Sequence, residues 1–216
     1  MHVSEEAARE LSGRPPGYWV GLALKSALLM LLLLPLLRPE LEQYEGKGMS
    51  WRVLVFPLAC VVVPLLWRAT GSRAPYPHAV DNLLVLVPLT DVLWNTLDTY
   101  DRVWGWDKAN HLGNSMIIAA VVGLWAARYP LGPVNRLTLA LGVGMTLQVL
   151  WEIAEYQSFA AGWSEPQTWA DTIGDFGFDL VGSFVGAALA LRAAIATEAS
   201  IETVPAAAYA AQSVRG

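Results

Sequence analysis

Six stretches of the sequence are largely apolar and about as long as the 20 residues that an α-helix needs to cross a bilayer. They cover residues 18–37, 51–67, 81–97, 107–127, 137–159 and 171–195. Hydrophobic residues make up 55% of the 216-residue chain and charged residues 15%, which is typical of integral membrane proteins. The sequence therefore predicts an all-α fold, a polytopic integral membrane protein with about six transmembrane helices in one bundle.

The two ends of the chain differ from this core in composition. Residues 1–17 are polar and lack the basic start and the cleavage site of a removable signal peptide, so we expect them to remain as a cytoplasmic tail. Residues 196–216 are rich in Ala, Ser and Thr, which predicts a disordered cytoplasmic tail. Residues 18–195 then form the six-span transmembrane domain.

Isolated residues in the first two spans have structural explanations. Lys25 is the one charge in the first span, and it can extend its charged end toward the membrane surface or pair with a buried acid. Pro57 and Pro64 are expected to bend the second span. Cys60 is the only cysteine and is expected to be a small core residue, so no internal disulfide and no catalytic thiol is predicted.

Basic residues in the connections predict the orientation, because Lys and Arg are enriched on the cytoplasmic side of a membrane. With six spans, the side of the N-terminus holds eight of them and the other side five. The eight are Arg9, Arg14, Arg68, Arg73, Arg128, Arg136, Arg192 and Arg215, and the five are Arg38, Lys47, Arg52, Arg102 and Lys108. This bias predicts a multi-pass protein of the plasma or inner membrane with both termini in the cytoplasm and the turn at 164–168 outside.

Carboxylates interrupt the last two apolar stretches. On a helix Glu152 and Glu155 are about 60° apart, and Asp171, Asp175 and Asp179 follow one another every four residues, so each set forms one stripe. An Asp at the centre of a transmembrane helix costs about 2.5 to 3.5 kcal/mol on insertion scales. Acids in such positions are by default candidates for a functional site.

The third and fourth stretches carry polar residues at the same helical spacing. Asp91, Asn95 and Asp98 share one face of the third stretch, and Asp107 and His111 are one turn apart in the fourth. In the predicted orientation these residues and the acids of the last two spans all lie in the outer half of the membrane or at its outer edge. An interfacial aromatic belt is expected at the same level. Its members are Trp94, Trp104, Trp106, Trp151, Trp163 and Trp169.

Helix capping explains only part of this polar level. Asp81, Asp107 and Asp171 stand where helices begin and can cap them. The other acids lie a turn or more inside their spans. The bases placed to balance them are Arg102, Lys108 and His111. Acids in excess of bases cannot stay fully ionised in a low dielectric, so the cluster is expected to take up protons or cations.

The ligand types of this cluster favour hard or borderline metal ions. Several carboxylates with one imidazole suit Mg²⁺, Mn²⁺, Ca²⁺ or a carboxylate-type iron or zinc centre rather than a thiolate site. A protonatable relay is the alternative use of the same acids. The candidate metal ligands are Asp107, His111, Glu152, Asp171, Asp175 and Asp179, and the candidate catalytic groups are Asp107, His111, Glu152, Glu155, Asp171 and Asp175.

Three motif blocks carry a family resemblance. They are DKANH (107–111), WEIAEY (151–156) and DTIGDFGFDLVGSFVGA (171–187). In order and spacing they resemble the blocks of the YjdF-type predicted inner-membrane proteins and, more distantly, of the VanZ-like family. The resemblance implies a small multi-span helical membrane protein, and the VanZ name is attached to glycopeptide-antibiotic resistance.

Three functions remain open from the sequence. The first is a metal-dependent enzyme that acts on a lipid or envelope precursor, and the second is a proton- or cation-coupled transporter in which the same acids titrate. The third is a non-catalytic membrane interaction protein whose polar core only fixes helix packing. The expected partner is the lipid bilayer, with a homo-oligomer as a further option. A net charge of −5 excludes nucleic acid, because no basic face is available to neutralise phosphates.

Overall fold

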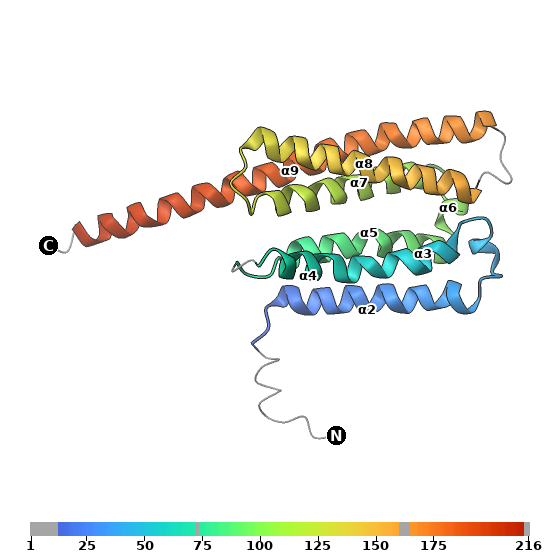
Figure 1. Ribbon diagram of the computed structural model, residues 1–216, viewed down its shortest axis with the longest axis horizontal. Helices are drawn as coiled ribbons and strands as arrows, with labels where there is room; N and C mark the ends of the chain where they lie inside the picture. Colours follow the sequence, from blue (N-terminus) through green and yellow to red (C-terminus); the bar gives the residue numbers. More distant parts are fainter. Residues whose placement is uncertain (1–12, 72–73, 160–164, 214–216) are drawn as a thin grey trace, which may run out of the picture. The chain divides into compact units, whose positions relative to one another are not determined.

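The structure is a computed structural model that describes residues 13–71, 74–159 and 165–213, with the backbone alone for 158–159, 165–166 and 200–213. In this part of the chain the regular structure is entirely helical (Figure 1), which confirms the all-α prediction. The α-helices are α2 (Pro16–Leu37), α3 (Met49–Val55), α4 (Ala59–Ala69), α5 (His78–Thr96), α6 (Thr99–Arg102), α7 (Trp106–Ala126), α8 (Pro133–Phe159) and α9 (Glu165–Ser213). Five residues named in the orientation and aromatic-belt predictions lie outside the described residues: Arg9, Arg73, Trp163, Ser164 and Arg215.

Each predicted span coincides with a helix or a helix pair. By length and composition, four helical segments can cross a membrane: Pro16–Leu37, Met49–Ala69, Pro133–Gln157 and Gln167–Ala199. The other two predicted spans correspond to α5, of 19 residues, and α7, of 21 residues. Both are long enough for a bilayer, but Asp and Asn side chains lower their hydropathy. The class of helical membrane protein is therefore confirmed.

The second predicted span is interrupted in its middle. A 3₁₀ turn at Phe56–Leu58 separates α3 from α4. Pro57 lies in this turn, where its missing N–H cannot complete the α-helical hydrogen-bonding pattern. Pro64 lies inside α4. The helix thus changes type at Pro57, and the bend expected from the two prolines stays a prediction.

Helix α9 is longer than the sixth predicted span. The composition predicts an end of this span at residue 195 and disorder in residues 196–216, whereas α9 continues to Ser213. The physical reason lies in the composition of this segment, because Ala has the highest helix propensity of all residues. Residues 196–213 are therefore helical in the structure, and the expectation of a disordered tail is corrected for them.

The chain forms two compact units. Unit 1 comprises Met1–Asn110 and Ile153–Thr168, and unit 2 comprises His111–Glu152 and Trp169–Gly216. In unit 1 helix α5 packs against α2, and α4 packs against α5. Apolar side chains such as Leu28 of α2 and Val85 of α5 are fully buried there.

A partly buried ion pair joins the first and third spans within unit 1. The Lys25 ammonium lies 2.7 Å from Oδ2 of Asp81, whose side chain is 5% exposed. The Tyr76 hydroxyl donates to the same oxygen at 2.8 Å. Burial and then this hydrogen bond raise the pKa of Tyr76, so its hydroxyl keeps the proton that it donates. Of the two roles left open for Lys25, the structure shows pairing with a buried acid.

Unit 2 is held together by small residues on α7, α8 and α9. A Cβ added at Gly186 would overlap the carbonyl oxygen of Met116, and one added at Gly182 would overlap that of Leu112. The α7 and α9 backbones therefore approach as closely as the sequence spacing Gly-x-x-x-Gly allows. The centre of the unit consists of fully buried alanines from all three helices, Ala119, Ala140 and Ala187.

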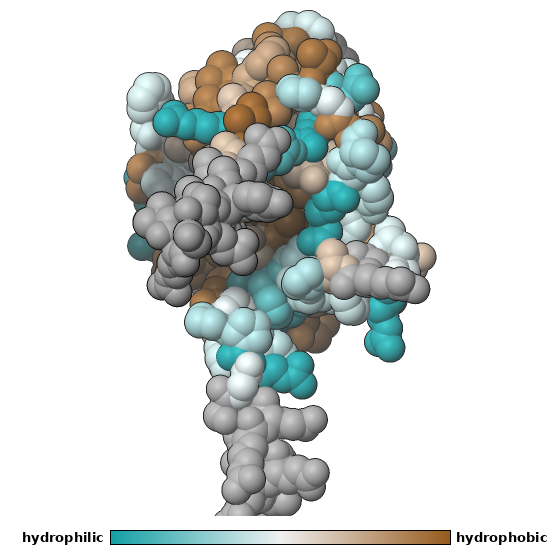
Figure 2. All heavy atoms as spheres, turned by 90° about the vertical axis from the view of Figure 1, so that its left-hand side faces the viewer, coloured by the Kyte–Doolittle hydropathy of each residue, from teal (hydrophilic) through white to brown (hydrophobic). Residues whose placement is uncertain are grey.

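Large apolar side chains also cover the outer surface of the helices. Met30 of α2 is 71% exposed, Leu54 of α3 is 77% exposed and Val134 of α8 is 75% exposed. Figure 2 shows hydrophobic surface of this kind on one face of the protein, beside hydrophilic side chains. Exposed apolar surface on this scale is expected where lipid, rather than water, surrounds the helices.

Candidate functional site

Three rows of polar residues face one another inside unit 2. Each row repeats every four residues, so its members share one side of their helix. The rows are His111 and Ser115 on α7, Gln148 and Glu152 on α8, and Asp175, Asp179 and Ser183 on α9, and all seven residues are at most 5% exposed. We call His111, Gln148, Glu152, Asp175 and Asp179 the buried acid–histidine cluster.

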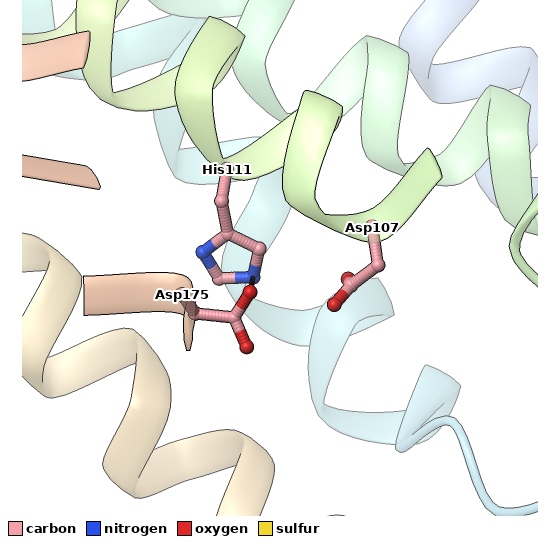
Figure 3. A group of neighbouring side chains, drawn as sticks. All are labelled: Asp107, His111 and Asp175. Atoms are coloured by element: carbon pink, nitrogen blue, oxygen red, sulfur yellow. Dashed lines mark ion pairs between the residues drawn. The ribbon is translucent and has the colours of Figure 1, made fainter. Parts of the chain in front are cut away.

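The imidazole of His111 lies between two aspartates of α9. Its Nδ1 is 3.2 Å from Oδ1 and 3.3 Å from Oδ2 of Asp179. Its Nε2 is 3.7 Å from Oδ1 of Asp175. Figure 3 shows the ring of His111 beside the Asp175 carboxylate. Both ring nitrogens therefore face a carboxylate, and the two carboxylates are one helical turn apart.

Helix α8 completes the cluster with an acid and an amide. Oε1 of Glu152 is 3.6 Å from Nδ1 of His111. The side-chain amide of Gln148 donates to Oδ1 of Asp179 at 2.6 Å. Asp179 thus accepts from α8 and faces the His111 ring of α7, although its own side chain is fully buried. The hydrogen bond from Gln148 fixes the orientation of this carboxylate.

Two candidate ligands lie one turn before the cluster on their helices. Asp107 precedes His111 by four residues on α7 and belongs to unit 1 (Figure 3). Its side chain is 38% exposed, and the Lys108 ammonium lies 3.3 Å from Oδ2 of its carboxylate. Asp171 precedes Asp175 by four residues on α9 and is partly buried. Both acids are more accessible than those of the cluster.

Glu155 has a different environment from the rest of the candidate set. It belongs to unit 1, where its Oε1 is 3.1 Å from Nη2 of Arg52. The Nε of Arg52 donates to Oδ2 of Asp91 at 3.0 Å, and Tyr100 donates to the other oxygen of Asp91 at 3.3 Å. A further guanidinium nitrogen donates to the backbone carbonyl of Lys47. Two of the expected excess acids, Asp91 and Glu155, are therefore paired with one buried arginine, whose single positive charge offsets one of the two carboxylates.

Sequence reasoning missed the role of Arg52. Arg52 is among the basic residues of the connections in the orientation prediction, but its side chain is 2% exposed and lies inside the α3 segment. The signal was its position directly after Trp51, within the second apolar stretch. Ser183 was also missed, because a serine in a transmembrane helix carries no charge that would mark it.

The spacing of the cluster atoms fits one cation. Nδ1 of His111 and one carboxylate oxygen each from Glu152 and Asp179 all lie within 4.8 Å of one another. Ligand atoms that share an ion at about 2.1 Å are about 3.0 to 3.4 Å apart in octahedral or tetrahedral geometry. The measured separations of 3.2 and 3.6 Å are close to these values. A hydrogen-bonded imidazolium between the aspartates is chemically compatible with the same distances.

The fold and the buried polar cluster define a helical membrane protein with an ionisable interior. The chain matches the family of predicted membrane proteins designated DUF2238 over residues 22–195. It therefore belongs to this family, which is that of the YjdF-type proteins, so the YjdF-type resemblance is confirmed. Neither a curated protein sequence nor a solved structure matches the chain.

Proposed function

We propose that this membrane protein binds a divalent cation through His111, Glu152 and Asp179. The observation that carries the proposal is the convergence of the three residues from three helices, with Nδ1 of His111 at 3.2 Å from Asp179 and 3.6 Å from Glu152. Mixed carboxylate and imidazole ligands suit Mg²⁺, Mn²⁺ or Zn²⁺, and Ca²⁺ would depend mainly on the carboxylates.

We assign supporting roles to the neighbouring side chains. Gln148 holds the Asp179 carboxylate through its 2.6 Å hydrogen bond, and Asp175 faces the second nitrogen of His111, where it can accept a proton. The more accessible acids Asp107 and Asp171 are proposed to be acid/base groups on the substrate side. A bound cation would polarise a phosphoryl or carbonyl oxygen and lower the pKa of a coordinated water.

The finer activity that we propose is metal-dependent catalysis on a lipid or envelope precursor. The polar rows are followed, one to two turns further along α7 and α9, by the alanine core of Ala119, Ala140 and Ala187. This close-packed core offers no polar ligands for a cation, so it favours a site that is reached from one end of the unit. The same proposal includes the distant VanZ-like relation. It also includes a location in the cell membrane with both termini in the cytoplasm.

A proton- or cation-coupled transporter is the second candidate. The observation in its favour is that both nitrogens of His111 face carboxylates, because this arrangement stabilises a doubly protonated imidazolium. In that case protons rather than a metal ion would neutralise the acids. A non-catalytic packing role is the third reading, in which the cluster only fixes the register of three helices.

Thermal unfolding in detergent distinguishes these readings. A cation at a hundredfold excess over its Kd should stabilise the protein by about 2.7 kcal/mol, which corresponds to a rise of roughly 5 to 10 °C in Tm. The experiment compares the parent with Asp179→Asn, with and without Mg²⁺, Mn²⁺, Ca²⁺ or Zn²⁺, at two pH values. The matched control is Glu198→Gln, an exposed acid of α9 that pairs with Arg136.

The proposal predicts a metal-dependent rise in the parent and in Glu198→Gln, and its loss in Asp179→Asn. A transporter predicts a Tm that responds to pH more than to metal, because protons then occupy the acids. A packing role predicts that no metal changes the Tm of the parent. A parent indifferent to every metal would remove the basis of the proposal.

A further inference from the structure

Ser183 is a buried hydroxyl one turn beyond Asp179. Its side chain is fully buried, and its Oγ has no hydrogen-bond partner among the described residues. An unsatisfied hydroxyl in an apolar interior costs about 1 to 3 kcal/mol. A serine inside a helix commonly avoids this cost by donating to a carbonyl three or four residues earlier.

Ser115 shows this ordinary behaviour in the same unit. It is also fully buried, and its Oγ donates to the carbonyl of His111 at 2.7 Å and to that of Leu112 at 3.1 Å. Ser115 of the α7 row and Ser183 of the α9 row thus differ in one respect. The hydroxyl of Ser115 is bound to its own helix, whereas that of Ser183 remains available on the side that continues the Asp175–Asp179 row.

Helix α8 presents a glycine to this hydroxyl. A Cβ added at Gly144 of α8 would lie in van der Waals contact, 3.4 Å from Oγ of Ser183 and 3.5 Å from Cβ of Ala119. Oγ of Ser183 therefore lies next to a glycine backbone instead of a methyl group. Gly144 precedes Gln148 by one turn on α8.

Asp179 has capacity for a further donor. Gln148 donates one hydrogen bond to it and Nδ1 of His111 lies 3.2 Å from it, whereas an ionised carboxylate can accept about four hydrogen bonds. Residues four apart on a helix have Cβ atoms about 5 to 6 Å apart, so the side-chain oxygens of Asp179 and Ser183 can come within reach of one water that makes two hydrogen bonds of about 2.8 Å each.

We propose that Ser183 holds a water molecule that hydrogen-bonds to Asp179 and forms the inner end of the buried acid–histidine cluster. The water satisfies the Ser183 hydroxyl and supplies the additional donor to the Asp179 carboxylate. Ser183 is then a positioning residue, which acts on the site through Asp179. The effect on cation binding rests on the proposed function, whereas the shared water does not.

A double-mutant cycle in metal-free protein tests the water itself. Tm is measured in the presence of a chelator for the parent, Ser183→Ala, Asp179→Asn and the double variant. A shared water predicts effects that are non-additive by roughly 2 °C or more, because either substitution weakens the same hydrogen-bonded bridge. The matched cycle with Ser115→Ala should be additive. Additive effects of Ser183→Ala and Asp179→Asn would overturn the proposal, whatever the metal results.

Mn²⁺ affinity then tests the consequence for the site. Ser183→Ala should weaken Mn²⁺ binding about tenfold, as loss of an outer-shell partner does, while Ser115→Ala leaves it unchanged. Gly144→Ala places a methyl group against Oγ of Ser183 and should weaken binding in the same way, whereas Gly142→Ala, which meets no neighbour within 4 Å, should not. Coupling in the cycle with no Mn²⁺ binding by the parent would support the water and contradict the proposed function. Parent-like Mn²⁺ affinity in both Ser183→Ala and Gly144→Ala would overturn the positioning role.

Discussion

Glu152 and Glu155 are less than one turn apart on α8, yet they have different partners. Glu152 lies 3.6 Å from the His111 ring, and Glu155 lies 3.1 Å from the Arg52 guanidinium. The same short motif therefore contributes one acid to a cluster with an imidazole and one acid to a buried ion pair. A proton or cation that neutralises Glu152 can dissociate and be replaced. The Arg52 guanidinium beside Glu155 keeps its charge permanently.

Removal of the Arg52 charge should destabilise the protein strongly. Arg52→Met leaves Asp91, which is 3% exposed, as a buried acid without its ion-pair partner, and breaking such a pair costs about 3 to 5 kcal/mol. The double variant Arg52→Met/Asp91→Asn should recover part of the loss. Thermal unfolding in detergent measures both. The control Arg102→Met removes an arginine whose side chain is 74% exposed and should change Tm little. Equal effects of Arg52→Met and Arg102→Met would show that the buried ion pair does not stabilise unit 1.

Close packing of α7 and α9 makes Gly186 sensitive to any side chain. Gly186→Ala places a Cβ against the carbonyl oxygen of Met116, and Gly186→Leu adds a larger overlap, so the two helices must separate. Both variants should give less folded protein and a lower Tm, with the greater loss for Leu. Gly177→Ala on the same helix meets no neighbour within 4 Å and serves as the control. If Gly186→Leu unfolds at the parental temperature, the close approach of the two backbones is contradicted.

The orientation in the membrane can be measured by cysteine labelling of intact cells. A Cys60→Ala background carries a single new cysteine, either at Ser164 or at Thr70, the exposed residue after α4. The bias of basic residues predicts labelling of the cysteine at position 164 by an impermeant reagent, and labelling at position 70 only after permeabilisation. The reverse pattern would place both termini outside.

The helices were predictable because hydropathy and helical length are local properties of the sequence. Prolines are also local signals, and Pro57 lies where the second span is interrupted. The end of α9 was not predicted, since an Ala-rich segment without strong apolar periodicity is compatible with both a disordered tail and a continued helix. Pro205 also lies in this segment, where a proline ordinarily interrupts a helix, so the local signals conflict and did not indicate that α9 continues to Ser213.

The candidate site was predictable in its residue types but only partly in its partners. Four-residue spacing identified the aspartate row of α9 and the position of His111, because helical geometry fixes which residues share a face. The separation of Glu152 from Glu155 depends on Arg52, which is 103 residues from Glu155 in the sequence. Pairings over such distances follow from tertiary packing, which helical periodicity does not specify.

The central claim is that His111 is a ligand of a bound divalent cation. Pulsed electron paramagnetic resonance of Mn²⁺-loaded protein detects magnetic coupling between the metal ion and a directly coordinated imidazole nitrogen. The sequence has three histidines, so ¹⁵N-histidine labelling followed by substitution of each one assigns the coupling. The account predicts a single coupled nitrogen in the parent and in the control His78→Gln, and its loss in folded His111→Gln. Bound Mn²⁺ without a coupled nitrogen, or a coupling that persists in His111→Gln, would contradict the account.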